Sequence, residues 1–338
     1  MPENRTAPPL LLMDQNDVIA AGGDNIRLAM QDVAQAITLL KQGQAGMPAE
    51  LSVPLDASAG PSAKAYALPA WLEGDYQTIG VKWTAHRQTR PPAEQAAVST
   101  TLINCRLTGQ KLGVVTSELL TAVRTAAVSA LVMQSMSFAH TPRIAVLGAG
   151  TIGARHLRMA TELFGHSAPI LLWNRTAQKA HALAAHYPEN LVRVVTDLGE
   201  IMRDADIVLA CTAAQHPFIL REHIHPGMLL IQAGYDEVTT QAITAFDHIC
   251  VDLWGDFAQT SAKSLFRQYR EGTLSRSDIT ADLGALVAGE WHPPLGESVY
   301  FSSFGLNIFD IALASRVIRS AQQGGQGGFP TPPMNHHK

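Results

Sequence analysis

The chain has 338 residues, of which 46% are hydrophobic and 16% are charged, and its formal net charge is −4. This composition is typical of a globular protein, and the length allows two domains of ordinary size. The charge argues against a nucleic-acid-binding surface and against a basic patch for membranes. No apolar run reaches the length of a membrane span, and the first residues lack the pattern of a signal peptide.

The three cysteines, Cys105, Cys211 and Cys250, are widely spaced and odd in number. This usage fits a reducing cytoplasm and argues against a disulfide framework or a zinc site. We therefore expect a cytoplasmic protein without a structural metal.

The first part of the chain predicts a mixed region of strands and helices. Residues 24–41 have the apolar spacing of an amphipathic helix, which Asp24 could cap. Strand-like runs occur at residues 10–13, 52–55, 65–68, 78–84, 98–104 and 111–116. Their spacing and a turn near residues 106–110 are typical of antiparallel hairpins. A long helix is expected from about Ser117 to Met136, with Ser117 as its N-cap.

From Arg143 onward, strands and helices alternate. Strands are predicted at residues 143–147, 170–173, 191–195, 207–211, 228–233 and 248–251. This alternation is typical of an α/β fold with a doubly wound parallel sheet of the Rossmann type. Helices are predicted near residues 258–269 and 279–288, and a final helix at residues 307–322. Residues 323–338 are rich in glycine and proline, so we expect a disordered tail there.

A G-x-G-x-x-G motif follows the first strand of this alternating region. Its glycines are Gly148, Gly150 and Gly153, and Thr151 and Ile152 open the helix that follows. In such a strand–turn–helix, the glycines let the backbone approach a pyrophosphate that lies on the amide groups at the helix start. The motif therefore predicts a dinucleotide site, and the alternative is a glycine-rich turn in another kind of α/β sheet.

The residues after the second strand of this region bear on the choice of dinucleotide. NAD sites usually carry Asp or Glu at this place to bind the ribose 2′-hydroxyl. Here the strand ends in Asn174, Arg175 and Thr176, without a carboxylate. The guanidinium of Arg175 suits a 2′-phosphate, with Asn174 and Thr176 as neutral donors beside it. The sequence therefore favours NADP(H) over NAD(H), although Arg175 could instead stack on the adenine.

Three charged residues elsewhere are unusual for a plain scaffold. Lys82 interrupts an apolar strand, and alternation places it on the face opposite Val81 and Trp83. Arg124 interrupts a helix of small residues, so it needs an anionic partner, either a structural carboxylate or that of a substrate. Asp236 follows a predicted strand at its carboxyl end, where open α/β sheets bind ligands. The alternatives are a solvated lysine, a structural ion pair and an ordinary turn aspartate.

Taken together, these segments resemble the ornithine cyclodeaminase/μ-crystallin family, in order from about residue 10 to residue 322. The most specific are Gly80-Val81-Lys82-Trp83 and Thr121-Ala122-Val123-Arg124-Thr125-Ala126-Ala127. Looser ones are Gly148-Ala149-Gly150, Ala205-Asp206-Ile207-Val208, Cys211-Thr212, Pro226-Gly227, Asp282-Leu283-Gly284 and Ser303-Phe304-Gly305.

The resemblance implies a homodimer of two-domain chains that act on amino acids. Residues 1–125 and 305–322 would form the substrate-binding and dimerisation domain, and residues 126–304 the Rossmann domain. Members of the family work at the Cα–N bond as cyclodeaminases, alanine dehydrogenases, ketimine reductases, and dehydrogenases of N-substituted amino acids. A small-molecule amino acid or imine is therefore the expected partner, with no nucleic acid and no membrane.

The resemblance also suggests roles for individual residues. Lys82 and Arg124 would hold the α-carboxylate, Asp236 would act as general acid or base, and Thr212 would lie in the cofactor site. One position departs from the family, which usually has Arg or Lys where this chain has Glu50, two residues after Pro48. At the pocket, Glu50 would remove one carboxylate ligand or accept a cationic group of the substrate, so the substrate is left open.

The leading hypothesis is an oxidoreductase that prefers NADP(H), with NAD(H) possible, and passes hydride between nicotinamide and the substrate Cα. A second hypothesis is an ornithine-type cyclodeaminase, which is a lyase with tightly held NAD. Arg175 argues against it, because NAD that is recycled within the enzyme has no 2′-phosphate to recognise. A third is a non-catalytic NADPH-binding protein, against which the set of Lys82, Arg124 and Asp236 argues. Direction and stereochemistry stay open.

Overall fold

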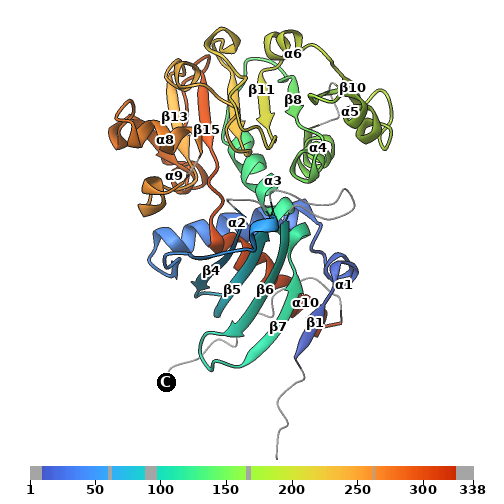
Figure 1. Cartoon of the computed structure of the whole chain (residues 1–338), viewed down its shortest axis with the longest axis vertical. Helices are drawn as coiled ribbons and strands as arrows, with labels where there is room; N and C mark the ends of the chain where they lie inside the picture. The colour runs from blue at the N-terminus through green and yellow to red at the C-terminus, as the bar shows by residue number, and fades with distance from the viewer. Residues whose placement is uncertain (1–9, 60–62, 88–96, 165–168, 262, 325–338) are drawn as a thin grey trace, which may run out of the picture. The chain divides into compact units, whose positions relative to one another are not determined.

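A computed structural model describes residues 10–59, 63–87, 97–164, 169–261 and 263–324, which belong to two compact units (Figure 1). Unit 1 comprises Met1–Thr121 and Asn307–Lys338, and unit 2 comprises Ala122–Leu306. The predicted boundaries at residues 125 and 305 thus lie within four residues of the divisions between the units. Of the predicted disordered tail, residues 325–338 lie outside the described residues.

Unit 1 is built on a seven-stranded sheet, in the described part of the chain, with the order β1-β7-β6-β5-β4-β2 and with β3 paired to β4. All its neighbours are antiparallel except β1 and β7, which run parallel. The strands are β1 (Leu11–Met13), β2 (Ala45–Gly46), β3 (Leu51–Pro54), β4 (Lys64–Leu72), β5 (Thr78–His86), β6 (Ala97–Cys105) and β7 (Lys111–Thr116). The predicted hairpins are therefore present.

One face of this sheet packs on helices α2 (Ile26–Lys41) and α10 (Asn307–Gln322), which also contact each other (Figure 1). Helix α10 comes from the far end of the sequence, so both chain ends build this unit, as the resemblance implies. The helix α2 was predicted correctly, but its cap is Asn25, whose side chain accepts the amides of Arg27 and Leu28. Asn25 directly precedes the first helical residue, whereas Asp24 lies one residue too early.

The other face of the sheet is apolar and exposed. Strand alternation places these side chains on one side, because the registers align Leu102 with Val81 and Trp83 with Ala67. We call this surface the apolar sheet face, and its exposed large side chains are Leu12, Leu51, Val53, Ile79, Trp83, Val98 and Leu102. Trp83 is 47% exposed and Leu51 is 71% exposed, whereas large apolar side chains in a protein core are almost fully buried.

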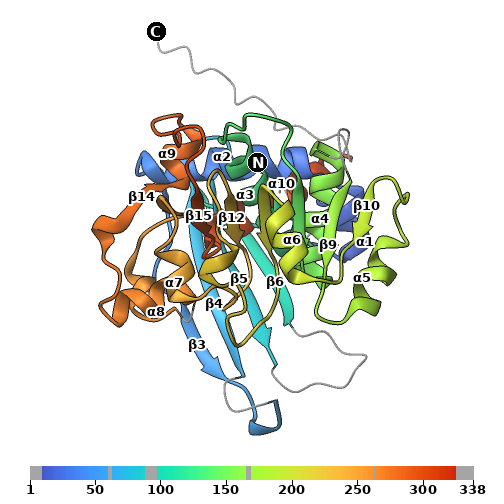
Figure 2. The same cartoon turned by 90° about the horizontal axis from the view of Figure 1, so that it is seen from above.

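Unit 2 contains a parallel sheet whose eight described strands follow the order β10-β9-β8-β11-β12-β15-β13-β14. Figure 2 labels β10, β9, β12, β15 and β14 of this sheet. They are β8 (Ile144–Leu147), β9 (Ile170–Trp173), β10 (Val192–Val194), β11 (Ile207–Ala210), β12 (Leu229–Gln232), β13 (His248–Val251), β14 (Ile279–Asp282) and β15 (Val299–Ser302). The order reverses between β8 and β11, which is the switch point where doubly wound sheets bind ligands. The predicted fold class is confirmed.

Helices cover this sheet and link its strands. Helix α3 (Glu118–Gln134) begins in unit 1 and continues into unit 2, and helix α4 (Thr151–Phe164) packs on β8 and β9. The others are α1 (Gln15–Ala20, in unit 1), α5 (Ala177–Ala184), α6 (Leu198–Asp204), α7 (Thr240–Ile243), α8 (Ser264–Arg270) and α9 (Leu283–Val287). Within the described ranges, no helix is both long and apolar enough to span a membrane.

The prediction of one helix at residues 279–288 was wrong. Ile279–Asp282 forms β14, which pairs with β13, and only the following residues form the short helix α9. The carboxylate of Asp282 caps that helix by accepting the amide of Ala285 at 2.9 Å. A four-residue segment is too short to show a distinct period, so its neighbours in the sheet decide its conformation. The strand β15 was not predicted for the same reason.

Candidate active site

Two glycines of the motif are required by the fold itself. Gly148 has a φ of +118°, and a Cβ there would lie 2.7 Å from the carbonyl oxygen of Cys211. A Cβ on Gly153 would lie 1.9 Å from the carbonyl oxygen of Gly148. These contacts join the turn after β8 to the end of β11 and to the start of α4. Any larger side chain at either position would push the turn away from the sheet.

Gly150 is different, because the packing of the protein does not require it. A Cβ on Gly150 would meet no heavy atom of the described residues within 4 Å, and its φ lies outside the left-handed region. The space beside Gly150 is therefore open, next to the amide groups that begin α4. A dinucleotide pyrophosphate approaching the backbone explains why this position lacks a side chain. The residues present thus fit the cofactor that the motif predicts.

The three residues after β9 have different surroundings. The side-chain oxygen of Asn174 accepts the amide of Ala149 at 3.0 Å, and its Nδ2 donates to the carbonyl of Thr176 at 2.9 Å. Asn174 therefore ties the glycine turn to the end of β9, and its predicted contact with the cofactor stays a prediction. Arg175 and Thr176 are exposed, and the Thr176 hydroxyl makes no capping hydrogen bond to α5. Both side chains are open to solvent, and their predicted contact with the cofactor stays a prediction.

A buried carboxylate organises the ends of β11 and β12. Glu237 is 0% exposed, and its Oε1 accepts both the amide of Thr212 at 2.9 Å and its hydroxyl at 3.0 Å. Its Oε2 accepts Nε2 of Gln232 at 2.9 Å. Burial raises the pKa of Glu237, while the bonds from Gln232 and Thr212 and the charge of Lys263 oppose that rise. The predicted cofactor residue Thr212 is thus held in place by Glu237.

The carboxylate of Asp236 has strong partners of its own. It is 3% exposed and accepts Oγ of Ser264 at 2.8 Å. Arg267 binds it through two guanidinium nitrogens, at 2.9 and 3.0 Å. This bidentate pair links the segment after β12 to helix α8. Asp236 therefore has a structural role as the partner of Arg267, which an ordinary turn aspartate lacks. Its role in proton transfer stays a prediction.

Lys82 is buried, so the alternative of a solvated strand lysine is wrong. Its side chain points from β5 toward α10, on the face opposite Trp83, and Nζ lies 3.0 Å from Oδ1 of Asp310. The hydroxyl of Thr121 donates to the same oxygen at 2.9 Å. Lys82 is 4% exposed and Asp310 1% exposed, so the pair is shielded from solvent. An ammonium in this setting interacts strongly with nearby carboxylates.

Arg124 lies on α3 in unit 2 and is 8% exposed. Its guanidinium packs against the backbone of Gly305, where a Cβ would lie 2.6 Å from one terminal nitrogen. Gly305 also has a φ of +94°, so both its conformation and this contact require glycine. The amide of Gly305 in turn donates to Oδ2 of Asp252 at 2.6 Å. The guanidinium of Arg124 therefore packs on the backbone of the Ser303-Phe304-Gly305 motif.

The remaining predicted residue, Glu50, is exposed and directly precedes the outer strand β3. Its effect on the substrate stays a prediction. Glu50 and Lys82 belong to unit 1, whereas the glycine motif, Arg124, Thr212 and Asp236 belong to unit 2.

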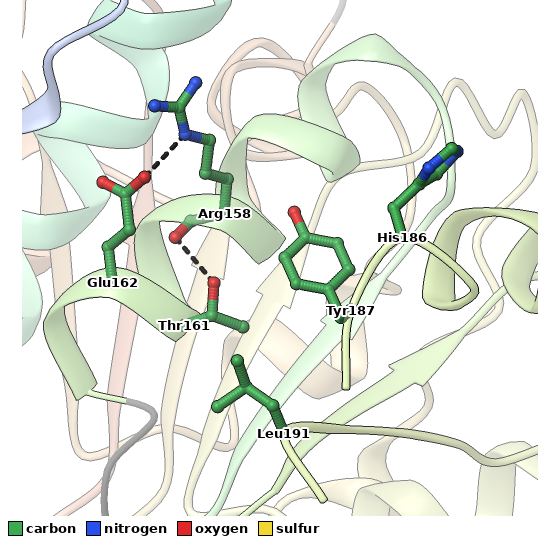
Figure 3. A pocket seen from close by; sticks show the side chains of 6 residues that line it. All are labelled: Arg158, Thr161, Glu162, His186, Tyr187 and Leu191. Atoms are coloured by element: carbon green, nitrogen blue, oxygen red, sulfur yellow. Dashed lines mark hydrogen bonds and ion pairs between the residues drawn. The ribbon is translucent and has the colours of Figure 1, made fainter. Parts of the chain in front are cut away.

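A hollow of about 350 Å³ lies elsewhere on unit 2 (Figure 3). Its lining comes from the second half of α4 and from the segment between α5 and β10, and consists of Arg158, Thr161, Glu162, His186, Tyr187 and Leu191. Arg158 is already paired with Glu162 at 2.6 Å. None of the predicted site residues lines this hollow, so we do not assign the site to it.

Sequence reasoning missed the partners that hold the site residues. Asp310 lies 228 positions from Lys82, and Lys263 carries no motif that marks it as functional. The one available signal for Asp310 was an acidic residue within a long apolar helix. A buried carboxylate of that kind requires a cation, and the structure shows that Lys82 provides it.

The geometry defines a class of protein. A doubly wound sheet carries an open glycine turn at its switch point, and a second unit built from both chain ends carries a buried lysine. Such an arrangement is that of a two-domain, dinucleotide-dependent protein. More particularly, the chain belongs to the ornithine cyclodeaminase/mu-crystallin family, whose model matches residues 13–325.

Named relatives cover most of the chain. It is 22% identical over 323 residues to N-((2S)-2-amino-2-carboxyethyl)-L-glutamate dehydrogenase from Staphylococcus aureus, which covers 93% of this chain and 96% of that protein. It is 27% identical over 251 residues to mouse ketimine reductase mu-crystallin, covering 72% of this chain and 74% of the relative.

A solved structure agrees in fold. The Thermococcus litoralis Delta(1)-pyrroline-2-carboxylate reductase, in complex with NADH and L-proline, matches with a TM-score of 0.83 at 20% identity. The match covers 94% of this chain and 99% of that one. The family model and the named relatives confirm the resemblance expected from the sequence.

Proposed function

We propose that this protein is an NAD(P)-dependent oxidoreductase that acts on the Cα–N bond of an amino acid or its imine. The observation that carries the proposal is the open space beside Gly150, at the switch point of a doubly wound sheet. Support comes from the family and from relatives that are named as a dehydrogenase and a reductase of this chemistry. Two buried cations, Lys82 and Arg124, supply charge for a substrate carboxylate.

The nicotinamide cofactor, when bound, exchanges a hydride with the substrate Cα. Lys82 and Arg124 hold the α-carboxylate, and their burial makes each cation more effective than it would be in water. The nitrogen must gain a proton when an imine is reduced and lose one in the reverse direction. Asp236 is our candidate for that transfer, directly or through a water, with Arg267 and Ser264 setting its position.

NADP(H) is the cofactor that we propose as preferred. The residues after β9 include no carboxylate for a ribose 2′-hydroxyl, and Arg175 is exposed at the end of that strand. A guanidinium there pairs with a 2′-phosphate through charge-assisted hydrogen bonds. NAD(H) stays possible, because the glycine turn recognises only the part that both dinucleotides share.

The test is spectroscopic turnover with a panel of substrates. Purified protein is mixed with NADPH or NADH and with cyclic imines and amine-plus-2-oxoacid mixtures, and absorbance at the nicotinamide band is followed. We expect oxidation of NADPH by at least one imine. Release of ammonia from a diamino acid without net change in the cofactor would instead indicate a cyclodeaminase. Tight NADPH binding without turnover of any panel member would favour a non-catalytic binding protein.

We further propose that the protein forms a homodimer through the apolar sheet face. This face presents exposed large side chains from four strands, β1, β3, β5 and β6, including Trp83, Leu51 and Leu102. A contiguous apolar surface of this kind marks an interaction site in a soluble protein. A second copy is the occupant that we propose, because two such faces can pack sheet on sheet about a two-fold axis. The family resemblance points to the same assembly.

A further inference from the structure

Lys263 holds together two strand ends of unit 2. It lies directly before α8, and its Nζ donates to the carbonyl oxygen of Gly234 at 2.7 Å, to that of Ala233 at 3.4 Å and to that of Ser303. Gly234 follows β12, and Ser303 follows β15, which is the neighbouring strand of the sheet. The ammonium therefore bridges the carboxyl ends of two adjacent strands.

Charges around Lys263 explain how a cation is tolerated there. Glu237 and Asp252 are both 0% exposed, and both attract the ammonium. Burial nevertheless lowers the pKa of Lys263 to about 8, the two carboxylates oppose that change, and the charge of Arg124 adds to it. The thiol of Cys211, which also lies close, has its pKa raised well above its ordinary range by burial. Lys263, which is itself half-buried, thus lies among buried charged groups that include Arg124.

Two charged side chains, Lys263 and Asp252, form hydrogen bonds with the segment after β15. Lys263 binds the carbonyl of Ser303, while Asp252 accepts the amide of Gly305 at 2.6 Å and lies 3.4 Å from the Ser303 hydroxyl. The guanidinium of Arg124 packs directly on Gly305. A shift of this segment would therefore change the position of Arg124.

We propose that Lys263 is a positioning residue that sets Arg124 for the substrate carboxylate by fixing the segment from Ser303 to Gly305. This inference rests on the proposed function, in which Arg124 binds that carboxylate. Three convergent carbonyl oxygens require three donors on one atom, which only an ammonium provides. A neutral side chain would leave buried carbonyls unsatisfied and the segment free to move.

The experiment compares Lys263→Met with wild type after wild-type turnover has been established. We expect KM for the amino acid or imine to rise about tenfold or more, which corresponds to the loss of about 1.4 kcal/mol of binding. The Kd for NADPH should change less than about threefold, because the glycine turn and Arg175 are untouched. Lys111→Met, at an exposed position of β7 in unit 1, is the matched control and should leave both constants unchanged.

Two results would overturn the inference. One is a folded Lys263→Met protein with wild-type KM. The other is an equal loss of substrate and NADPH binding, which would mean general damage to unit 2. If the Met variant does not fold, KM for the substrate and Kd for NADPH are measured instead for Lys263→Gln, which keeps two N–H donors. Absence of turnover in the wild type contradicts the proposed function instead, so the two failures are distinguishable.

Discussion

At the scale of single residues, the site is made of charges whose partners the sequence does not reveal. The sequence predicted that Arg124 needs an anionic partner, and the structure shows that Lys82 has one as well, Asp310. That partner comes from the last helix of the chain, so no local pattern could have identified it. Gly150 shows the opposite case, because its motif alone predicted a ligand and the open space beside it agrees.

Arg175 carries the first residue-scale prediction. Arg175→Ala should weaken NADPH binding by about 1.5 to 3 kcal/mol, the usual contribution of a hydrogen bond to a charged group. NADH has no 2′-phosphate, so its affinity should hardly change. Fluorescence titration of both cofactors measures the two effects, with Arg276→Ala, at an exposed position that precedes β14, as a charge-matched control. Equal losses for NADPH and NADH, or tighter NADH binding by the wild type, would contradict the proposed role.

At the scale of helices and strands, pairing with distant strands decided whether short segments formed a strand or a helix. The strands β8, β9 and β13 were predicted from their own residues, because each is a continuous apolar run with loops or helices on either side. Ile279–Asp282 joined the sheet edge as β14 instead of the predicted helix, since β13 offered it a partner. The cap of α2 moved by one residue for a local reason, namely that Asn25 directly precedes the helix.

Helices α3 and α4 meet inside unit 2 through His156. This imidazole is 0% exposed, and it contacts the carbonyl of Ile152 through Nδ1 at 2.9 Å and the hydroxyl of Ser129 through Nε2 at 2.9 Å. A carbonyl can only accept, so Nδ1 carries the proton and Nε2 accepts from Ser129. Burial lowers the pKa of His156 to about 4, although the bond to Ile152 opposes that change.

The sign of the resulting pH dependence follows from linkage. The unfolded chain, with a histidine pKa of 6.5, binds the extra proton more readily than the folded chain does. The His156 contribution is therefore complete above pH 6.5 and is lost as the pH falls toward about 4, by up to about 3 kcal/mol. Urea unfolding should show the stability advantage of wild type over His156→Gln shrinking over this range. An advantage that is constant from pH 7 to pH 4.5 would show that His156 does not titrate as described.

At the scale of the whole molecule, the sequence predicted the two-unit organisation and the use of both chain ends. It gave no sign of the apolar sheet face, because alternation along one strand does not show whether a partner covers it. The described chain leaves Trp83 and Leu51 exposed, which a stable soluble monomer rarely does over a contiguous surface.

The dimer prediction is tested by size-exclusion chromatography with light scattering. Wild type should have twice the mass of one chain at micromolar concentration. Trp83→Asp introduces a charge into the apolar sheet face and should shift the protein toward monomer. Leu107→Asp is the control, since Leu107 is 76% exposed in the turn between β6 and β7. A monomeric wild type, or a Trp83→Asp protein that dimerises as wild type does, would rule out this interface.

The proposed function requires that hydride passes between the nicotinamide and the substrate Cα. The most direct measurement uses NADPH carrying deuterium at nicotinamide C4, in separate preparations for each face of the ring. The imine that turns over is reduced with each preparation, and the product amino acid is analysed by mass spectrometry and NMR. We predict that one of the two cofactors places a single deuterium on Cα. Product without deuterium from either cofactor, or ammonia release with the label retained in the cofactor, would contradict the account.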